Sequence, residues 1–450
     1  MTPAAAIISW EEDALRGLAQ EALALCEADE AEVVLQGTDQ HLARFSAGTL
    51  HQHTAEQTLE LRIRAIRNDR VGVATTTDLS RGGLERVSHR AVALAARQAP
   101  DPHFPGLPGP CDFVRIPEAH HEATASRTPQ EREATVRTLV QAAQTLGGTA
   151  SGHHATSRHV LAVANTRCLW GWHAGTRAEW SVVAQQGEAT GYAARLSPDV
   201  MTVDPAGLAK EAMARAIPPL ELPATLKGTH RVMLEPYAVA DWLTMLAYMG
   251  FGATSVAQGT SFLCEAGETS LTSPILDLWD NPLDPLMPAR PFDAEGTPKQ
   301  PLALLKNGVG QNCVHDRRSA RQAGRSSTGH ALPPPNPYGA FPAHLDLGPG
   351  DRSRQELLDL LGDGLLITRF HYISVLDPRQ ARLTGLTRDG VLQVRQGKIV
   401  GACRNARYTG SILEALRGVV GVGKDAILMP SILGSVRCPA VVLEALALEP

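Results

Sequence analysis

Sixteen histidines give this chain several candidate ligands for a metal ion. His51 and His53 are two positions apart in an expected strand, so their side chains point to the same face, as a pair of metal ligands must. His120-His121 and the group His153-His154 with His159 are the other clusters. None of them has a carboxylate or a cysteine at a recognised zinc-site spacing. We therefore interpret each cluster as surface or hydrogen-bonding histidines.

A second set of residues that could do chemistry lies between Ala289 and Gly296. Arg290 is followed closely by Asp293 and Glu295. A guanidinium near carboxylates can bind a peptide terminus, or it can form an ion pair within the protein. The residues alone leave both interpretations open.

Arginines are concentrated between His315 and Arg325. No aromatic residue stands among them and the chain has a formal net charge of −5, so the pattern favours a solvated helix face over a nucleic-acid patch. The sequence also has no Gly-x-Ser-x-Gly elbow, no phosphate-binding Gly-x4-Gly-Lys loop and no dinucleotide Gly-x-Gly-x-x-Gly after a strand.

The most informative stretch runs from Arg231 to Leu263. Its apolar run 232–234 predicts the end of a buried strand, and Pro236 suits the first position of a helix because its missing N–H is not needed there. Apolar residues then recur at helical spacing until Gly250. A helix that starts directly after a strand offers unpaired N–H groups, so this is a place where chemistry is often found.

This stretch resembles the TldD/PmbA family. The catalytic TldD branch carries His-Glu-x-x-x-His here, with two zinc-binding histidines and a glutamate as base. In this chain Glu235, Pro236 and Ala240 stand at those three positions. The sequence pattern LEP-x-AVA followed by GFGA-x-SV-x-QG-x-SFL instead resembles the metal-free PmbA/TldE branch. An older label of the family is modulator of DNA gyrase.

The third zinc ligand of the catalytic branch is a cysteine in a Gly-rich loop. The corresponding segment Gly421–Pro430 has no cysteine, and Cys438 matches a different position. The resemblance therefore implies that this chain has no catalytic residue and no cofactor of its own, and that zinc is bound by a partner subunit.

The resemblance also suggests cleft or interface residues. The segment RPFD-x-EG resembles a family segment near the central cleft, which implies cleft roles for Arg290, Asp293 and Glu295. His330 follows a family-like Ser-Thr-Gly, and Arg369 lies in a Thr-Arg-Phe element at the end of a strand. A salt-bridged turn, a structural histidine and a structural ion pair are the respective alternatives.

Composition places the chain among ordinary soluble globular proteins of two or three domains. It has 450 residues, of which 43% are hydrophobic and 20% charged. No stretch approaches the roughly 18 apolar residues of a membrane span, and Met1–Ser9 shows no secretory signal. Seven scattered cysteines without a C-x-x-C pair make a disulfide framework unexpected. We therefore expect a cytoplasmic location, with no nucleic-acid and no membrane partner.

The first half should combine amphipathic helices with antiparallel strands. Ser9 and Thr128 begin capping-box patterns that predict helix starts. Strands are expected at 31–36, 42–50 and 58–66, the last with Leu61 and Ile63 inward and Arg64 outward. Strands followed by a helix occur near 31–97 and again near 149–216, which suggests a repeat.

The second half of the sequence has mainly strand-like patterns, with short expected strands around glycine and proline turns. A linker is expected at 217–224. The predicted fold class is α+β: an N-terminal α/β domain with antiparallel strands at 1–222 and a β-rich C-terminal domain at 223–450.

By resemblance, the expected function is that of a non-catalytic PmbA/TldE-like subunit of a heterodimeric zinc metallopeptidase. A TldD-like partner would carry His-Glu-x-x-x-His, and unfolded or leader peptides would be the substrates. Two alternatives stay open: a metal-independent hydrolase with a repurposed cleft, and a peptide-binding scaffold or regulator without proteolysis.

Overall fold

The computed structural model describes residues 10–219, 226–266 and 270–450. It confirms the α+β class, with a strand-rich C-terminal part. The predicted boundary at 222/223 and most of the predicted linker fall on residues 220–225, outside the described residues, so the division into domains 1–222 and 223–450 stays a prediction.

The first half is organised by one antiparallel sheet of long strands, in the order β3-β2-β1-β4-β5-β6. The strands are β1 (Glu30–Ser46), β2 (Thr49–Arg67), β3 (Arg70–Thr76), β4 (Thr149–Asn165), β5 (Trp170–Gln186) and β6 (Ala189–Ser197). β1 and β4 pair at the centre, and each starts a meander of three strands. The expected repeat is therefore present as two similar halves side by side.

The strand predictions for the first hairpin were too short. β1 continues from Glu30 to Ser46, and the turn to β2 lies at Ala47 and Gly48, both with positive φ. The predicted strand 42–50 thus straddles a turn, because an alanine gives no local signal for a left-handed conformation.

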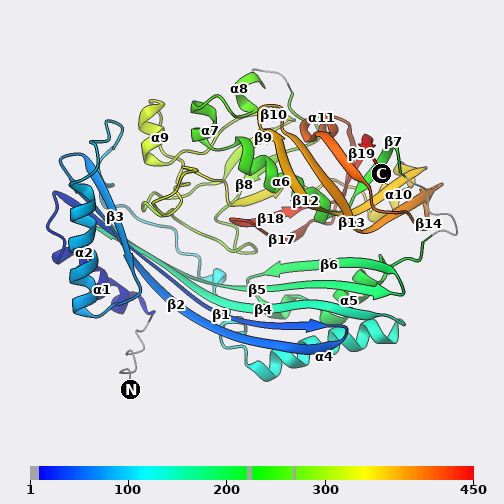
Figure 1. Cartoon of the computed structure of the whole chain (residues 1–450), viewed down its shortest axis with the longest axis horizontal. Helices are drawn as coiled ribbons and strands as arrows, with labels where there is room; N and C mark the ends of the chain where they lie inside the picture. The colour runs from blue at the N-terminus through cyan, green and yellow to red at the C-terminus, as the bar shows by residue number, and fades with distance from the viewer. Residues whose placement is uncertain (1–9, 220–225, 267–269) are drawn as a thin grey trace.

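Helices cover the outer face of this sheet (Figure 1). They are α1 (Glu12–Ala24), α2 (Arg81–Ala95), α3 (Glu122–Ala125), α4 (Pro129–Thr145) and α5 (Pro205–Met213). The capping box at Thr128 and Glu131 is confirmed, with both reciprocal bonds present. Ser9 of the other expected box lies outside the described residues; α1 begins after Glu11, whose side chain makes no capping bond.

The second half lies against the inner, concave face of the long sheet (Figure 1). It has two sheets, in the orders β10-β9-β8-β11-β18-β17 and β14-β13-β12-β7-β19-β16, with β15 paired to β13. The strands are β7 (Gly228–Leu234), β8 (Leu278–Asp280), β9 (Leu302–Lys306), β10 (Val309–Gly310), β11 (His344–Leu347), β12 (Gly364–Asp377), β13 (Arg382–Arg395), β14 (Lys398–Ala402), β15 (Arg407–Ser411), β16 (Val419–Val422), β17 (Ile427–Ser431), β18 (Gly434–Cys438) and β19 (Val441–Leu448).

The helices of the second half are α6 (Pro236–Gly250), α7 (Ala253–Ala257), α8 (Leu263–Ala266), α9 (Arg317–Gln322), α10 (Arg354–Leu361) and α11 (Ile412–Arg417). α6 contacts β12 of one sheet and β17 and β18 of the other. It is apolar nearly all round, as a helix enclosed between two layers must be. The largest core cluster includes Trp242 of α6 and Trp180 of β5, so the two halves share apolar packing.

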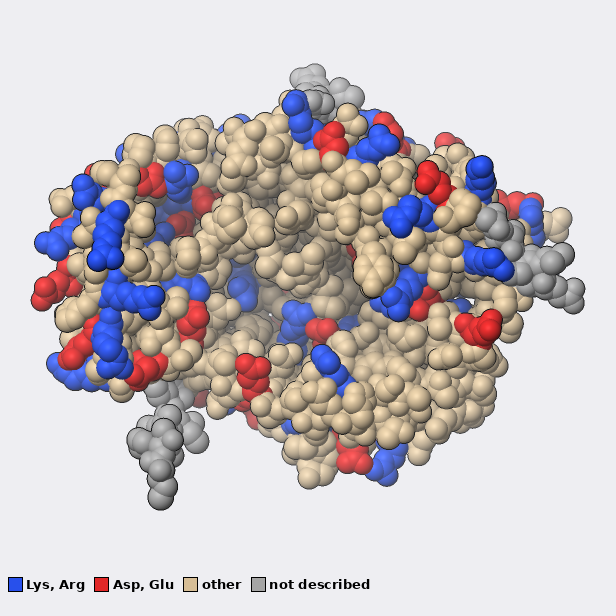
Figure 2. All heavy atoms as spheres, viewed as in Figure 1, with Lys and Arg blue, Asp and Glu red and all other residues tan. Residues whose placement is uncertain are grey.

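Among the described residues, no helix is long and apolar enough to cross a membrane. On the face shown in Figure 2, acidic and basic side chains are intermixed over both halves.

Candidate functional site

The junction of β7 and α6 places Glu235 at the N-cap and Pro236 at the first helical position, as expected. Glu235 is only 2% exposed. Its Oε2 accepts a hydrogen bond from Arg215 at 3.0 Å, and its Oε1 accepts one from Arg354 at 2.8 Å. Burial alone would raise the pKa of Glu235, but the two arginine charges outweigh it and lower the pKa to about 2. Glu235 is thus a permanently ionised partner of two arginines.

The remaining motif positions offer no metal ligand. Ala240 is buried and has no donor atom for a metal. Cys438 lies closer to the motif positions than its place in the sequence indicated. It is fully buried, and its Sγ donates to the carbonyl oxygen of Pro236 at 3.2 Å. Burial holds the pKa of this thiol well above its usual value, which disfavours the thiolate that zinc requires.

A zinc ion therefore does not fit these residues. Glu235 is saturated by arginines, Ala240 is inert and Cys438 is a buried thiol. Within residues 10–219, 226–266 and 270–450, no group of three or more His, Cys, Asp or Glu side chains is arranged to bind a metal.

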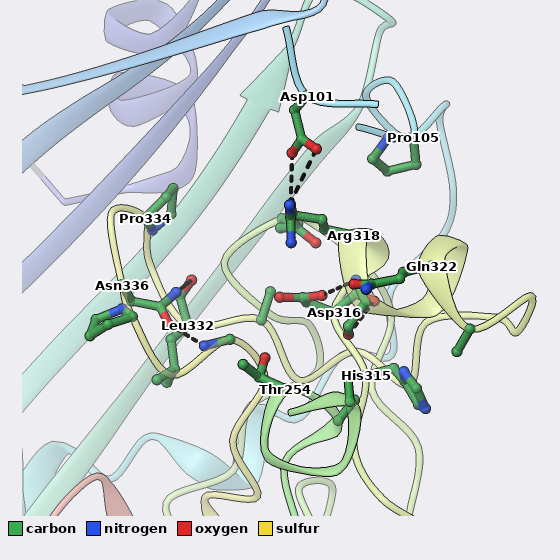
Figure 3. Close-up of a pocket in the computed structure, with 18 of the residues that line it drawn as sticks. Asp101, Pro105, Thr254, His315, Asp316, Arg318, Gln322, Leu332, Pro334 and Asn336 are labelled. Atoms are coloured by element: carbon green, nitrogen blue, oxygen red, sulfur yellow. Dashed lines mark hydrogen bonds and ion pairs between the residues drawn. The ribbon is translucent and has the colours of Figure 1, made fainter. Parts of the chain in front are cut away.

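A cleft of about 1390 Å³ lies between the two halves. One wall comes from β3 and from the segment around Asp101 and Pro105. The other comes from α7, α9 and the loop 331–339. Figure 3 shows Asp101 and Pro105 at the top of this space and Arg318 reaching towards Asp101, with Thr254, His315, Leu332, Pro334 and Asn336 around its lower part. The walls carry both polar and apolar side chains, as ligand-binding clefts commonly do.

The arginines in and after α9 lie largely at the surface, as expected, with Arg318, Arg321 and Arg325 exposed; they also make contacts that the sequence did not indicate. Arg318 donates to both carboxylate oxygens of Asp101, at 2.7 and 3.3 Å. Arg317 and Arg321 donate to the carbonyl oxygens of Gly106 and Phe104. These contacts tie α9 to the first half of the chain across the cleft.

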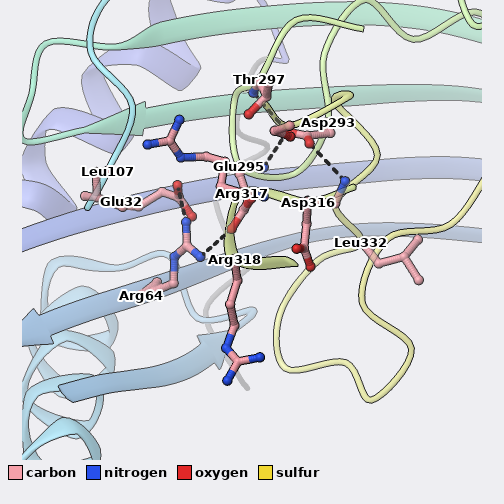
Figure 4. A network of polar contacts seen from close by, with 12 residues as sticks. Glu32, Arg64, Leu107, Asp293, Glu295, Thr297, Asp316, Arg317, Arg318 and Leu332 are labelled. Carbon is pink, nitrogen blue, oxygen red and sulfur yellow. Dashed lines mark hydrogen bonds and ion pairs between the residues drawn. The ribbon is translucent and has the colours of Figure 1, made fainter. Parts of the chain in front are cut away.

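Glu295 is the one predicted cleft residue that lines this cleft. It accepts a bond from Arg64 at 2.9 Å, and Arg64 also donates to Glu32 at 2.8 Å (Figure 4). Arg64 is 8% exposed, so its expected outward position was wrong. Near Arg64, the side of β2 opposite the helices faces the second half of the chain, which buries it there.

Asp293 organises the loop that carries Glu295. Its Oδ1 accepts from the backbone N–H groups of Glu295 and Thr297, and its Oδ2 from that of Ala331, all at 2.9 Å. Burial and then the nearby Glu295 raise the pKa of Asp293 to about 7, although the N–H donors act in the opposite direction. Asp293 does not line the cleft, which favours a loop-forming role.

His330 and Arg369 lie away from the cleft lining. His330 is 1% exposed, and its Nε2 lies 3.0 Å from Asp280 Oδ1 in the interior of the second half. Arg369 donates to Asp389 at 2.7 Å, and its guanidinium lies 4.0 Å from the ring centre of Tyr192 on β6. Arg369 therefore joins β12 to the long sheet within the chain.

Sequence analysis missed the partners that complete these groups, chiefly Arg64, Arg215, Arg354 and Asp101. Each comes from a distant part of the chain, and no spacing pattern marks it. Arg64 carried a possible signal, since it alternates with apolar residues in a strand that could have been buried on both faces.

Two family models match this chain: the PmbA/TldA metallopeptidase domain 1 over residues 31–95, and the PmbA/TldA metallopeptidase C-terminal domain over residues 227–449. An uncharacterised protein of Methanocaldococcus jannaschii is 33% identical over 101 residues. That match covers 22% of this chain and 24% of the relative, so it spans about a quarter of the relative's length.

Solved structures resemble the whole chain. TldE from Thermococcus kodakarensis superposes with a TM-score of 0.86 at 18% identity, covering 97% of this chain and 100% of that one. A putative modulator of DNA gyrase from Thermotoga maritima gives 0.86 at 20% identity, covering 96% and 100%. One from Bacteroides thetaiotaomicron gives 0.82 at 18%, covering 98% and 100%. At these identities the likeness establishes the fold. With its two family models matching at both ends, the chain belongs to the PmbA/TldD family of metallopeptidase-related proteins.

Proposed function

We propose that this chain is the metal-free, PmbA/TldE-like subunit of a heterodimeric zinc peptidase. A TldD-like partner supplies His-Glu-x-x-x-His and the zinc ion, and the pair acts on unfolded or leader peptides in the cytoplasm. The proposal rests on the residues that stand at the zinc-motif positions of this chain and on their contacts. Glu235 is held between Arg215 and Arg354, and Ala240 lacks any ligand atom.

The cleft supports a role in holding an extended peptide. Val71 and Val73 of β3 line it, and β3 is the edge strand of the long sheet. The two-residue turn Asn68-Asp69 has positive φ at both positions, so its flanking residues Arg67 and Arg70 form a hydrogen-bonded pair. Alternation then directs the N–H and C=O groups of Val71 and Val73 away from β2. A peptide strand can pair with such an edge.

The two alternatives receive less support. A metal-independent hydrolase needs a carboxylate base at the cleft, but Glu235 has a pKa of about 2 and accepts bonds from two arginines. Asp293 has a raised pKa, but its carboxylate already accepts hydrogen bonds from three backbone N–H groups. A scaffold without proteolysis differs from the proposal only in lacking a zinc-bearing partner, which is a matter for experiment.

The deciding experiment is co-purification with the TldD-like protein of the same organism. We expect a stable complex whose interface exceeds roughly 2,000 Å² in total, stoichiometric zinc in the complex, and chelator-sensitive cleavage of β-casein. The untagged chain alone should hold no stoichiometric zinc and should cleave nothing. A stable monomer with every TldD-like protein of that organism, or zinc bound by this chain alone, would contradict the proposal.

The variant Val71→Pro tests the edge of β3. Proline removes the N–H that faces the cleft but is tolerated at a strand edge. We expect the complex to form normally while cleavage of β-casein slows. Val71→Thr, which keeps the N–H and the β-branched shape, is the matched control and should cleave like the unchanged complex.

The triple variant Glu235→His, Pro236→Glu, Ala240→His should remain inactive on β-casein by itself. It restores the residue types of the catalytic motif but supplies only two imidazole ligands. A catalytic zinc site needs three protein ligands. The change Glu235→His would also remove one of the two carboxylates that Arg215 contacts. Chelator-sensitive cleavage by this variant alone would show that a third ligand is already in place.

A further inference from the structure

Strand β2 is much longer than the strand that pairs with its outer edge. β3 pairs only with the segment Leu61–Arg67 of β2. From Thr49 to Glu60, β2 therefore has β1 on one side and no described strand on the other. This part of β2 runs along the border of the long sheet (Figure 1). Residues 51–58 are all exposed, so neither face of this stretch is covered.

Alternation along β2 decides which of its backbone groups are open. Because Arg67 and Arg70 form a hydrogen-bonded pair, the odd-numbered residues of β2 direct their N–H and C=O groups towards β3. The register with β1 runs from Ile66 to Gln52 without a shift, so the same alternation holds beyond the end of β3. The backbone groups of residues 53, 55 and 57 thus face the open edge, and no described residue bonds to them there.

This edge lacks the features that keep free strand edges from pairing. Natural sheets protect such edges with proline, with lysine or other charged residues, with bulges, or by covering them. Between Gln52 and Glu60 the sequence has no proline, lysine or arginine, and Glu56 is the one acidic residue among the exposed residues 51–58. The pairing with β1 shows no bulge over the same stretch. The edge is therefore suited to accept another strand.

The same stretch of a second copy of this chain is complementary to this edge. Two antiparallel strands related by a two-fold axis pair odd residues with odd ones, because hydrogen-bonded residues must both face the shared edge. With the axis at Thr54, this residue lies opposite the partner's Thr54, and Gln52 lies opposite the partner's Glu56. His53 then forms a hydrogen-bonded pair with the partner's Ala55. Thr–Thr and amide–carboxylate pairs both stabilise neighbouring strands through side-chain hydrogen bonds.

The neighbouring registers fit less well. With the axis at Ala55, the partner's Thr49 would lie opposite Leu61, where Thr76 of β3 is already paired. With the axis at His53, this residue would lie opposite itself, and Glu56 would lose its amide partner. The free length of the edge and its side chains therefore select the register centred on Thr54.

We propose that two copies of this chain associate by antiparallel pairing of their β2 edges, centred on Thr54. The two long sheets then join into one continuous sheet. His53 and Ala55 of each copy exchange main-chain hydrogen bonds with the other copy, and these bonds provide affinity as they do when a peptide strand is added to a sheet. The proposal concerns the isolated chain and does not depend on a zinc-bearing partner.

The test is sedimentation velocity of the untagged full chain over a wide range of concentrations. We expect a reversible dimer. The variant Ala55→Pro removes an N–H that faces the open edge, where proline is tolerated, and it should weaken dimerisation about tenfold or more. Ala55→Ser keeps this N–H, so it is the matched control and should dimerise like the unchanged chain. Circular dichroism checks that each variant is folded.

Charged variants at the two-fold axis test the register and give a second measurement if Ala55→Pro does not fold. Thr54→Glu and Thr54→Lys each place like charges opposite one another, so each variant alone should dimerise more weakly than the unchanged chain. An equimolar mixture of the two places opposite charges there and should restore the dimer. An unchanged chain that is monomeric at every concentration, or a dimer that none of these changes weakens, would overturn the proposal. A mixture without rescue would overturn the pairing centred on Thr54.

Discussion

Replacing Glu235 by glutamine should destabilise the chain by roughly 3 kcal/mol at pH 7. The lowering of its pKa from 4.5 to about 2 corresponds to that free energy. Removal of one partner from a buried ion pair gives a similar figure, about 3–5 kcal/mol. We expect the lower end, because Arg354 is 46% exposed at its side chain and Arg215 keeps a second carboxylate, Glu211, at 3.0 Å.

The dependence on pH distinguishes this ion cluster from simple loss of packing. Because the folded-state pKa lies below the unfolded one, the contribution of Glu235 is present above pH 4.5 and is lost as the pH falls towards 2. The difference between the unchanged chain and Glu235→Gln should therefore shrink to about half near pH 3.

Urea unfolding at pH 7 and pH 3 measures both quantities. Glu444→Gln, at an exposed position, is the control and should change stability by less than about 0.5 kcal/mol. A loss below 1 kcal/mol at pH 7, or one that is equal at both pH values, would refute the assigned role of the cluster.

Two further substitutions test the remaining packing. Arg64→Met should lower the free energy of unfolding by about 3–5 kcal/mol, because it leaves Glu32 and Glu295 buried without their cation. Arg67→Met, at an exposed position of the same strand, should have little effect, and equal losses in urea unfolding would count against the ion cluster. Thr128→Ala should cost about 1 kcal/mol through loss of the cap on α4, and an unchanged urea midpoint would contradict that.

Local patterns in the sequence were sufficient for much of the fold. The apolar run before Glu235 predicted β7, and Pro236 and Gly250 predicted the bounds of α6. Thr128 with Glu131 predicted the start of α4. These signals act within a few residues, so they are visible without tertiary structure. The turn at Ala47 was missed because its conformation is set by the hairpin and not by its residue type.

The site was less predictable because it depends on which faces meet. Alternation alone predicted that the Arg64 side chain points to solvent. In the structure the second half of the chain packs against this side of β2 and buries the side chain. Arg369 and His330 were suggested as cleft or interface residues; their partners Asp389 and Asp280 hold them away from the lining of the cleft, and an interface role stays a prediction. A resemblance to a family suggests which residues to consider, but it does not give the distances between their side chains.

The central pairing of β1 with β4 has a consequence for how the chain folds. Within each half of the long sheet, neighbouring strands follow one another along the chain, whereas Glu32 must find Asn165 to join the halves. Closing such a long loop is slow relative to forming a hairpin. Each meander can therefore form early, with one edge of its first strand still unpaired, and the joining of the two is the late step. A newly made chain is then most exposed to mispairing along the free edges of β1 and β4, before these two strands pair with each other.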